Sequence, residues 1–264
     1  MPSLNQGKNR HLESDSNFHR ASCKEMEDAK EVHRAFFPQE DFSIPGLDCE
    51  IFYRPARGIG GDYYDFLPLP DRWGIAIGDV CGKGISAALL MASLQASLRA
   101  QTMHAHSDLS TLIVDVHQWI LAASPKHLYA SLFYAEYDAT TSQLQYVNAG
   151  HNSPMVLRWE NDGCEVFHLE PTGIALGLLE SSQFSSKAFQ LERGDLFVAY
   201  TDGITESENP FGESWGQQRL DILLRDCHGF SPAQIVGRVL DEISVFRSNR
   251  PQLDDMTLMA ARVR

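Results

Sequence analysis

The order of strand-like and helix-like segments constrains this chain of 264 residues more than any single motif does. From residue 48 onward, apolar residues recur with a period of two, which is typical of β-strands. Helix-like stretches stand in two blocks, at residues 85–124 and after residue 216, rather than between successive strands. Strands that follow one another without intervening helices favour antiparallel sheets. The sequence therefore predicts an α+β fold in which helices pack outside antiparallel sheets.

The expected elements follow from this periodicity and from turn and capping residues. The expected strands are residues 48–54, 63–67, 73–78, 129–138, 143–149, 155–159, 164–169, 184–191, 195–200 and 256–263. The expected helices are residues 85–101, 108–124 and 217–225, and one that begins at a capping box formed by Ser231 and Gln234.

The N-terminal part of the chain differs in pattern from the rest. Residues 1–21 are polar and unpatterned, which predicts a flexible segment. Residues 22–39 are expected to form a helix, because a Ser-x-x-Glu capping box opens it and Pro38 closes it. The apolar face of this helix would pack on its own domain or against a second copy, so a regulatory role and a homodimer through it stay open. Residues 40–264 contain no linker or repeat and are expected to form one domain.

Charge and cysteine content limit the classes of partner and compartment. A formal net charge of −13 argues against nucleic acid, or an anionic membrane, as the main partner. Five cysteines are scattered without CxxC spacing, which favours free thiols in a reducing compartment over a zinc site or disulfides. The chain shows no apolar leader and no membrane-length apolar run. We therefore expect a soluble, cytoplasmic protein.

Aspartates recur in turn-like settings at the ends of the expected strands. They stand in the dipeptides Gly61-Asp62, Gly78-Asp79, Asp202-Gly203 and Asp254-Asp255. A single Gly-Asp is usually only a turn, but several carboxylates in one cleft repel one another unless cations neutralise them. Carboxylate oxygens are the ligands that Mg²⁺ and Mn²⁺ prefer. We therefore expect these four places to converge on one metal centre.

Such a centre suits one kind of chemistry. Two divalent cations about 3.5–4 Å apart can share a carboxylate and a water molecule, which becomes acidic enough to act as a nucleophile at neutral pH. In-line attack on phosphorus fits this arrangement. We therefore expect no catalytic side-chain nucleophile, because a metal-bound water takes that role.

Two further polar residues lie in or near these motifs. Lys83, at the start of an expected helix, could meet a phosphate oxygen, although Gly78–Gly84 lacks the spacing of a nucleotide-binding P-loop. His151 follows an expected strand and is either a proton shuttle or a histidine that stabilises a turn.

Six segments together resemble a known family. They are GGDYYDF (60–66), GDVCGKGISAALLM (78–91), NAGHNSP (148–154), TGIALG (172–177), YTDGITES (200–207) and DDMT (254–257). In order and spacing, over about residues 25–264, the set resembles the PPM-type metal-dependent protein serine/threonine phosphatases, most of all their bacterial SpoIIE/RsbU-like branch. The resemblance implies a β-sandwich with helices packed on both outer faces (αββα) and a pair of Mn²⁺ or Mg²⁺ ions at one end.

The resemblance also implies which residues hold the ions. Asp79 matches the bridging carboxylate, and Val80 matches the residue whose backbone carbonyl also binds. The other implied ligands are Asp62, Asp202 and Asp254. The residues expected to support these ligands or to contact the substrate are Asp255, Asp65, Lys83, Gly203 and His151.

One position departs from the wider family. Eukaryotic members carry Asp-Gly-His, whose histidine is a candidate general acid, whereas this chain has Asp79-Val80-Cys81. The leaving-group proton then falls to a metal-bound water or to an unidentified side chain. The Cys81 thiol either makes the site sensitive to oxidation or is buried and inert.

The function that the resemblance implies is hydrolysis of phosphoserine or phosphothreonine in proteins, with residues 40–264 as the catalytic domain. The implied substrate is a phosphorylated anti-sigma-factor antagonist, a small STAS-type protein of a partner-switching pathway. One alternative is a catalytically silent binding module with the same fold. Another is a different metal-dependent hydrolase, such as a phosphodiesterase or nuclease, although the net charge of −13 argues against nucleic acid.

Overall fold

The computed structural model describes residues 23–38, 43–103, 108–160 and 163–264. Its contacts divide the chain into two compact units, Met1–Phe37 and Pro38–Arg264. In the first unit, residues 23–35 form a helix, and the rings of His33 and Phe37 meet edge to face with centroids 5.2 Å apart. The expectations for residues 1–21 and for a helix start at Ser22 lie outside the described residues.

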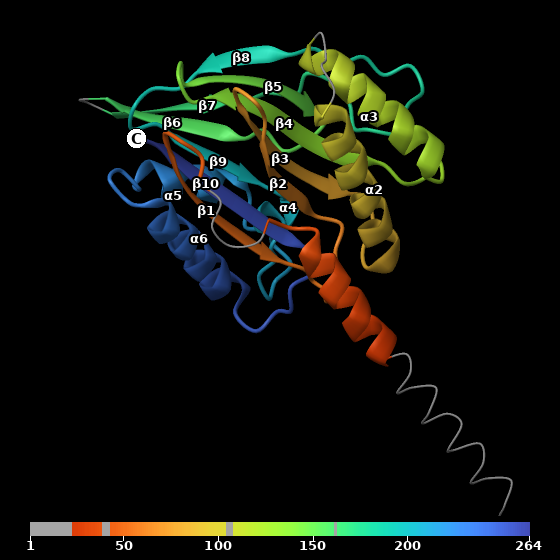
Figure 1. Cartoon of the computed structure of the whole chain (residues 1–264). Coiled ribbons are helices and arrows are strands. Elements are labelled where there is room, and N and C mark those ends of the chain that lie inside the picture. Colours follow the sequence, from red (N-terminus) through yellow and green to blue (C-terminus); the bar gives the residue numbers. More distant parts are fainter. Residues whose placement is uncertain (1–22, 39–42, 104–107, 161–162) are drawn as a thin grey trace, which may run out of the picture. The chain divides into compact units, whose positions relative to one another are not determined.

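The second unit contains, among its described residues, two antiparallel sheets of five strands each (Figure 1). The first sheet has the strand order β1 (Leu47–Arg54), β10 (Met256–Val263), β9 (Leu196–Tyr200), β6 (Met155–Glu160) and β7 (Gly163–His168). The second has the order β2 (Tyr63–Pro68), β3 (Trp73–Val80), β4 (Ala130–Asp138), β5 (Gln143–Ala149) and β8 (Lys187–Gln190). All neighbouring strands run antiparallel, as the grouping of strands and helices in the sequence predicts.

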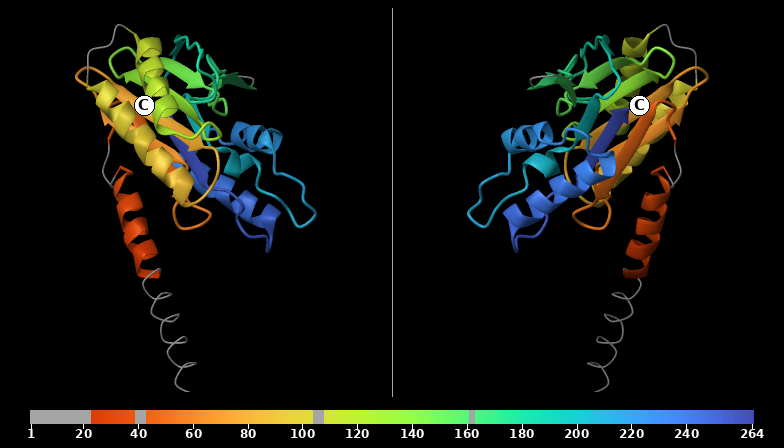
Figure 2. Two further views of the ribbon diagram at one scale, coloured as in Figure 1. Left: turned by 90° about the vertical axis from the view of Figure 1, so that its right-hand side faces the viewer. Right: turned by 90° about the vertical axis from the view of Figure 1, so that its left-hand side faces the viewer.

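Helices cover the outer face of each sheet (Figures 1 and 2). On one side, α2 (Ile85–Thr102) contacts β2 and β3, and α3 (Leu109–Ala123) contacts β5. On the other side, α6 (Pro232–Arg247) contacts β1 and β10, and α5 (Gln217–Arg225) packs against α6. The expected α+β sandwich with helices on both outer faces is therefore confirmed.

The strand β9 shows how the layers are held together. All of its residues are buried, because successive side chains enter two different apolar layers. Phe197 faces the other sheet, where its ring centroid lies 6.0 Å from that of Phe133 on β4. Leu196 and Val198 instead join the core that forms beneath α5 and α6. Packing on both faces fixes the end of β9, and with it the residues that follow Tyr200.

Two elements differ from the sequence expectation. β8 covers only Lys187–Gln190 rather than residues 184–191. Phe184 is buried, and the N–H of Ser185 donates to the Thr172 carbonyl over 3.1 Å, so this stretch packs on the loop at Thr172 instead of pairing with β5. A short helix, α4 (Asp202–Thr205), was not expected, because a single turn is too short to show a helical period.

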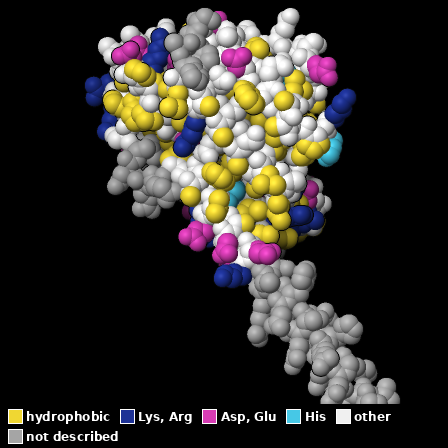
Figure 3. All heavy atoms as spheres, turned by 45° about the vertical axis from the view of Figure 1, so that its right-hand side comes forward, with side chains coloured by type: hydrophobic (Ala, Val, Ile, Leu, Met, Phe, Trp, Pro, Cys, Tyr) yellow, Lys and Arg dark blue, Asp and Glu magenta, His cyan; other side chains and the backbone are white. Residues whose placement is uncertain are grey.

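Figure 3 draws one face of the chain, which carries mixed charges. On the face drawn in Figure 3, Lys and Arg side chains stand singly among apolar and acidic ones. As far as its residues are described, that face offers no basic band of the kind that binds a nucleic acid backbone. Within the described part of the chain, no helix is both long and apolar enough to cross a bilayer.

Candidate metal centre

Two of the expected ligands lie at the end of the hairpin formed by β2 and β3. Asp62 immediately precedes β2, and Asp79 is the penultimate residue of β3, which continues past the expected end at residue 78. Because the two strands are antiparallel neighbours, these ends lie together. The Val80 N–H donates to the Gly61 carbonyl over 3.3 Å. A Cβ on Gly61 would come within 2.9 Å of the Val80 carbonyl oxygen, so glycine allows this close approach.

The other two expected ligands lie at matching ends of the first sheet. Asp202 follows β9 as the first residue of α4, and Asp254 stands two residues before β10. β9 and β10 are antiparallel neighbours, and the Thr201 N–H donates to the Thr257 carbonyl over 3.1 Å. The pairing therefore gathers both aspartates at one end of this sheet.

Asp62 joins the two sheets at this edge. Its Oδ2 accepts hydrogen bonds from the hydroxyls of Thr201, over 2.7 Å, and Thr257, over 2.6 Å. Burial raises the pKa of the Asp62 carboxyl from its ordinary 3.8 to about 8; the charge of Asp255 adds to the rise, and the two threonine hydroxyls oppose it. The sequence reasoning did not single out these threonines, although both lie within the motifs YTDGITES and DDMT.

Asp79 stands at the electrostatic centre of the cluster. Burial raises its pKa from 3.8 to about 9. Repulsion adds to this rise, and it comes from the carboxylates of Asp62, Asp202, Asp254 and Asp255, in decreasing order. Carboxylates from four separate parts of the chain thus act on one another at this edge.

Asp202 and Asp254 share the influence of one lysine. Burial raises the pKa of Asp202 from 3.8 to about 6, the charges of Glu206 and Asp254 contribute, and the charge of Lys83 opposes them. Lys83 forms an ion pair with the Asp254 carboxylate. Its ammonium also donates to the Leu253 carbonyl over 2.8 Å. Lys83 is therefore held by the segment that carries Asp254, and its charge also reaches Asp202.

Asp255 shapes the backbone around the centre. Its two carboxylate oxygens accept hydrogen bonds from the N–H groups of Ala56 and Gly61, each over 2.7 Å. A Cβ on Gly60 would lie 2.2 Å from this carboxylate, and a Cβ on Gly203 would lie 1.8 Å from the Asp255 carbonyl oxygen. Glycine is required at both positions, because any side chain would displace the Asp255 segment.

Asp65 is used differently from the other aspartates of the motifs. It is fully buried on β2, and its carboxylate accepts hydrogen bonds from Arg99 Nε over 2.7 Å and Arg99 Nη2 over 3.0 Å. The Tyr63 hydroxyl and the Phe66 N–H also donate to it. Asp65 therefore fastens α2 to β2.

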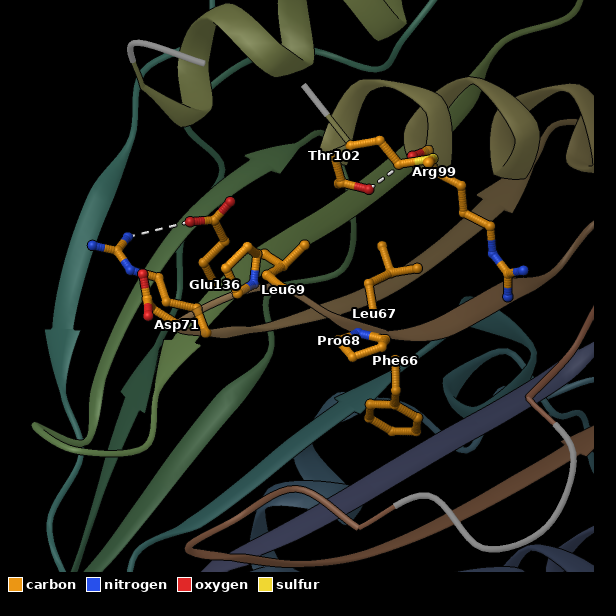
Figure 4. Close-up of a pocket in the computed structure, with 11 residues that line it drawn as sticks. Phe66, Leu67, Pro68, Leu69, Asp71, Arg99, Thr102 and Glu136 are labelled. Carbon is orange, nitrogen blue, oxygen red and sulfur yellow. Dashed lines mark hydrogen bonds and ion pairs between the residues drawn. The ribbon is translucent and has the colours of Figure 1, made fainter. Parts of the chain in front are cut away.

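A cavity of about 820 Å³ lies next to this ion pair. Figure 4 shows its lining: Arg99 and Thr102 come from the end of α2, Phe66 and Leu67 from β2, and Leu69 and Asp71 from the β2–β3 turn. The β2–β3 turn joins the far ends of these two strands, whereas Asp62 and Asp79 stand at their near ends. Arg99 and Thr102 likewise lie at the end of α2 that is farther along the chain from Asp79. This cavity is therefore separate from the acidic cluster.

His151 lies beneath the edge rather than at its surface. It is buried, and its ring Nδ1 is 2.7 Å from the Ser131 hydroxyl. Its backbone N–H donates to Asn148 Oδ1 over 2.8 Å. Burial lowers the pKa of the imidazole to about 4, so it is neutral at neutral pH. These contacts support the turn-stabilising interpretation over the proton shuttle.

The residues at this edge offer the donors that a hard divalent cation requires. They supply buried and half-buried carboxylate oxygens and the Val80 carbonyl. The repulsion that contributes to the raised pKa of Asp79 is the kind that a cation relieves. Among the described residues, no three His, Cys, Asp or Glu side chains already stand close enough to hold one ion. Two of the carboxylates have other partners, since hydroxyls hold Asp62 and Lys83 holds Asp254.

Solved structures share this architecture. The SiaA-PP2C domain of Pseudomonas aeruginosa superposes with a TM-score of 0.81 and 21% identity, covering 93% of this chain and 98% of that one. The catalytic domain of the serine/threonine phosphatase PstP, solved in complex with 2 manganese ions, has a TM-score of 0.59 and 15% identity, covering 82% of this chain and 98% of that one. The fold is thus that of PP2C-type, or PPM-type, phosphatase domains.

Sequence comparison identifies the family. Residues 70–264 match the family described as Stage II sporulation protein E (SpoIIE), so the chain belongs to the SpoIIE family. It is 32% identical over 231 residues to phosphoserine phosphatase RsbU of Bacillus subtilis (strain 168), a match that covers 85% of this chain and 64% of RsbU. It is 29% identical over 271 residues to protein IcfG of Synechocystis sp., covering 89% of this chain and 41% of that protein. The chain spans less than two thirds of the length of either relative.

Proposed function

We propose that this chain is a metal-dependent protein serine/threonine phosphatase that hydrolyses phosphoserine and phosphothreonine. The observation that carries the proposal is geometric: β2–β3 pairing brings Asp62 to Asp79, β9–β10 pairing brings Asp202 to Asp254, and the Thr201 and Thr257 hydroxyls bind Asp62 from the other sheet. Burial, together with repulsion among these carboxylates, raises the pKa of Asp79 to about 9. Such mutual repulsion is unfavourable without cations, and perturbed carboxylates cluster at functional sites. Membership of the SpoIIE family and the name of RsbU, a phosphoserine phosphatase, support the same reaction.

The residues that would hold two Mn²⁺ or Mg²⁺ ions are Asp62, Asp79, Asp202, Asp254 and the backbone carbonyl of Val80. When bound, such ions supply Lewis acidity and a nucleophilic water. In this proposal the Thr201 and Thr257 hydroxyls orient Asp62 by donating hydrogen bonds to its carboxylate. Asp255 fixes the segment before β2 through the N–H groups of Ala56 and Gly61, so that Asp62 faces the first sheet.

Position 81, two residues after Asp79, holds a cysteine rather than a histidine that could act as the general acid. His151 is buried, neutral and bonded to Ser131, which leaves it poorly matched to deliver a proton at neutral pH. We propose that a water molecule, rather than this side chain, protonates the leaving serine or threonine oxygen.

The proposed substrate is a phosphorylated anti-sigma-factor antagonist of the STAS type, in a cytoplasmic partner-switching pathway. The likeness to RsbU supports this substrate class. A homodimer through the helix at residues 23–35 remains a proposal for how such a protein would be regulated.

The test is release of phosphate from a phosphoserine peptide, in Mn²⁺ and in EDTA, by the wild type and by Asp202→Asn. The matched control is Asp241→Asn, the same change at an exposed position on α6. We expect Mn²⁺-dependent turnover in the wild type and the control, and near-complete loss in Asp202→Asn, because that variant lacks a ligand. If the folded wild type showed no turnover with Mn²⁺, a catalytically silent binding module would replace the phosphatase in this account.

A further inference from the structure

A short glycine-flanked loop places one lysine directly on the metal centre. The loop joins β3 to α2 and carries Lys83 between Gly82, with φ of 104°, and Gly84, with φ of 71°. Both glycines adopt the left-handed region that other residues avoid. Gly84 is also the N-cap of α2 and makes no side-chain cap, so no hydrogen bond from a capping side chain fixes the loop to the helix.

The ammonium of Lys83 is directed at the segment that precedes β10. It pairs with the Asp254 carboxylate and donates to the Leu253 carbonyl over 2.8 Å. The side chains of the pair are 35% and 27% exposed, so water screens the pair only in part. The same positive charge acts on Asp202. One protein cation is therefore paired with a carboxylate that is proposed to bind metal, and its charge also acts on a second one.

We propose that Lys83 is an internal counter-ion that holds Asp254 until a divalent cation replaces it. Cation binding at Asp254 is then an exchange, in which the ammonium leaves the carboxylate as the metal arrives. The inference rests on the proposed function, because it takes Asp254 as a metal ligand. It accounts for Asp254 having a protein partner although it lies among other carboxylates.

The exchange has two consequences for the protein. Lys83 stabilises the metal-free form, because it offsets part of the repulsion among the carboxylates. It also competes with the metal for Asp254, so it raises the concentration of cation that is needed to fill the centre. The two glycines let the lysine withdraw without unwinding α2.

The test measures Mn²⁺ binding, independently of turnover, by isothermal titration and by the rise of the melting temperature with Mn²⁺. The variants are Lys83→Met, which removes the charge and keeps much of the length, and Lys83→Arg, which keeps the charge. The matched control is Lys187→Met, the same change at an exposed position, the first residue of β8.

We expect Lys83→Met to bind Mn²⁺ roughly fivefold more tightly than the wild type, the factor for a partly exposed ion pair. In EDTA it should melt about 2–4 °C lower, because Asp254 has lost its partner. Lys83→Arg and Lys187→Met should stay close to the wild type in both measurements.

Unchanged or weaker Mn²⁺ binding by Lys83→Met would overturn the inference and leave the proposed function standing. If that variant kept the wild-type Mn²⁺ affinity but lost inhibition by inorganic phosphate, Lys83 would be a phosphate ligand instead. A folded wild type that bound no Mn²⁺ at all would overturn both the inference and the proposed function.

Discussion

The Asp65–Arg99 pair offers a sharp test of which motif aspartates belong to the metal centre. Asp65 is fully buried and accepts four hydrogen bonds, two of them from Arg99, whereas the Arg99 side chain is 47% exposed. In Asp65→Asn, the NH₂ group replaces an oxygen that accepts two of these four hydrogen bonds, one of them from Arg99. Leaving a buried donor unsatisfied costs about 1–3 kcal/mol. Loss of the charge on one side of a half-exposed pair adds about 1 kcal/mol.

We therefore expect Asp65→Asn to lower the free energy of unfolding by about 2–4 kcal/mol, or the melting temperature by about 4–12 °C. Its Mn²⁺ affinity should stay within about twofold of the wild type, because Asp65 faces α2 and not the acidic edge. Arg99→Met should destabilise the protein more, since it leaves a buried carboxylate without its cation. Denaturant unfolding and Mn²⁺ titration measure the two quantities. Wild-type stability together with lost Mn²⁺ binding in Asp65→Asn would refute this assignment.

Two further predictions concern the acidic edge itself. Asp62 and Asp79, whose pKa values rise to about 8 and 9, bind protons more tightly folded than unfolded, so in EDTA the stability should fall as pH rises from about 6.5 to 9. The pH range starts there because the pKa of His151 is lowered from 6.5 to about 4, which makes stability rise with pH up to about 6.5. A free energy of unfolding, measured with urea in EDTA, that increased from pH 6.5 to 9 would contradict the raised pKa values. Gly203→Ala should lose both Mn²⁺ binding and several kcal/mol of stability, because its Cβ would lie 1.8 Å from the Asp255 carbonyl oxygen. The control is Gly237→Ala, where an added Cβ meets nothing within 4 Å. Equal stability of the two variants would count against the close approach at Gly203.

Local patterns predicted the elements well where one face of a segment is strongly marked. The strand at residues 256–263 and the helix at residues 217–225 have the expected bounds. The capping box of Ser231 and Gln234 forms as expected, because all of its partners lie within one turn. The late start of β8 was not predictable, since it depends on Phe184 packing against a loop that is distant in sequence.

The partners of the aspartates were predictable only in part. Glycine beside aspartate indicated which carboxylates stand at strand ends, because that signal is local. Arg99 lies 34 residues from Asp65, and Lys83 lies 171 residues from Asp254. Those pairs arise from the docking of α2 on β2 and from the meeting of the two sheets, which no local pattern encodes. The sequence therefore identified the carboxylates but not the cations that the protein itself supplies.

The most direct test of a shared metal centre is Mn²⁺ titration of the wild type and Asp79→Asn, with unfolding of both in EDTA at about pH 8. We expect Asp79→Asn to lose Mn²⁺ binding and yet to be more stable than the metal-free wild type, because it removes a carboxylate that burial and the neighbouring carboxylates disfavour. Asp241→Asn should change neither quantity. If Asp79→Asn bound Mn²⁺ as the wild type does, the four carboxylates would not form one centre.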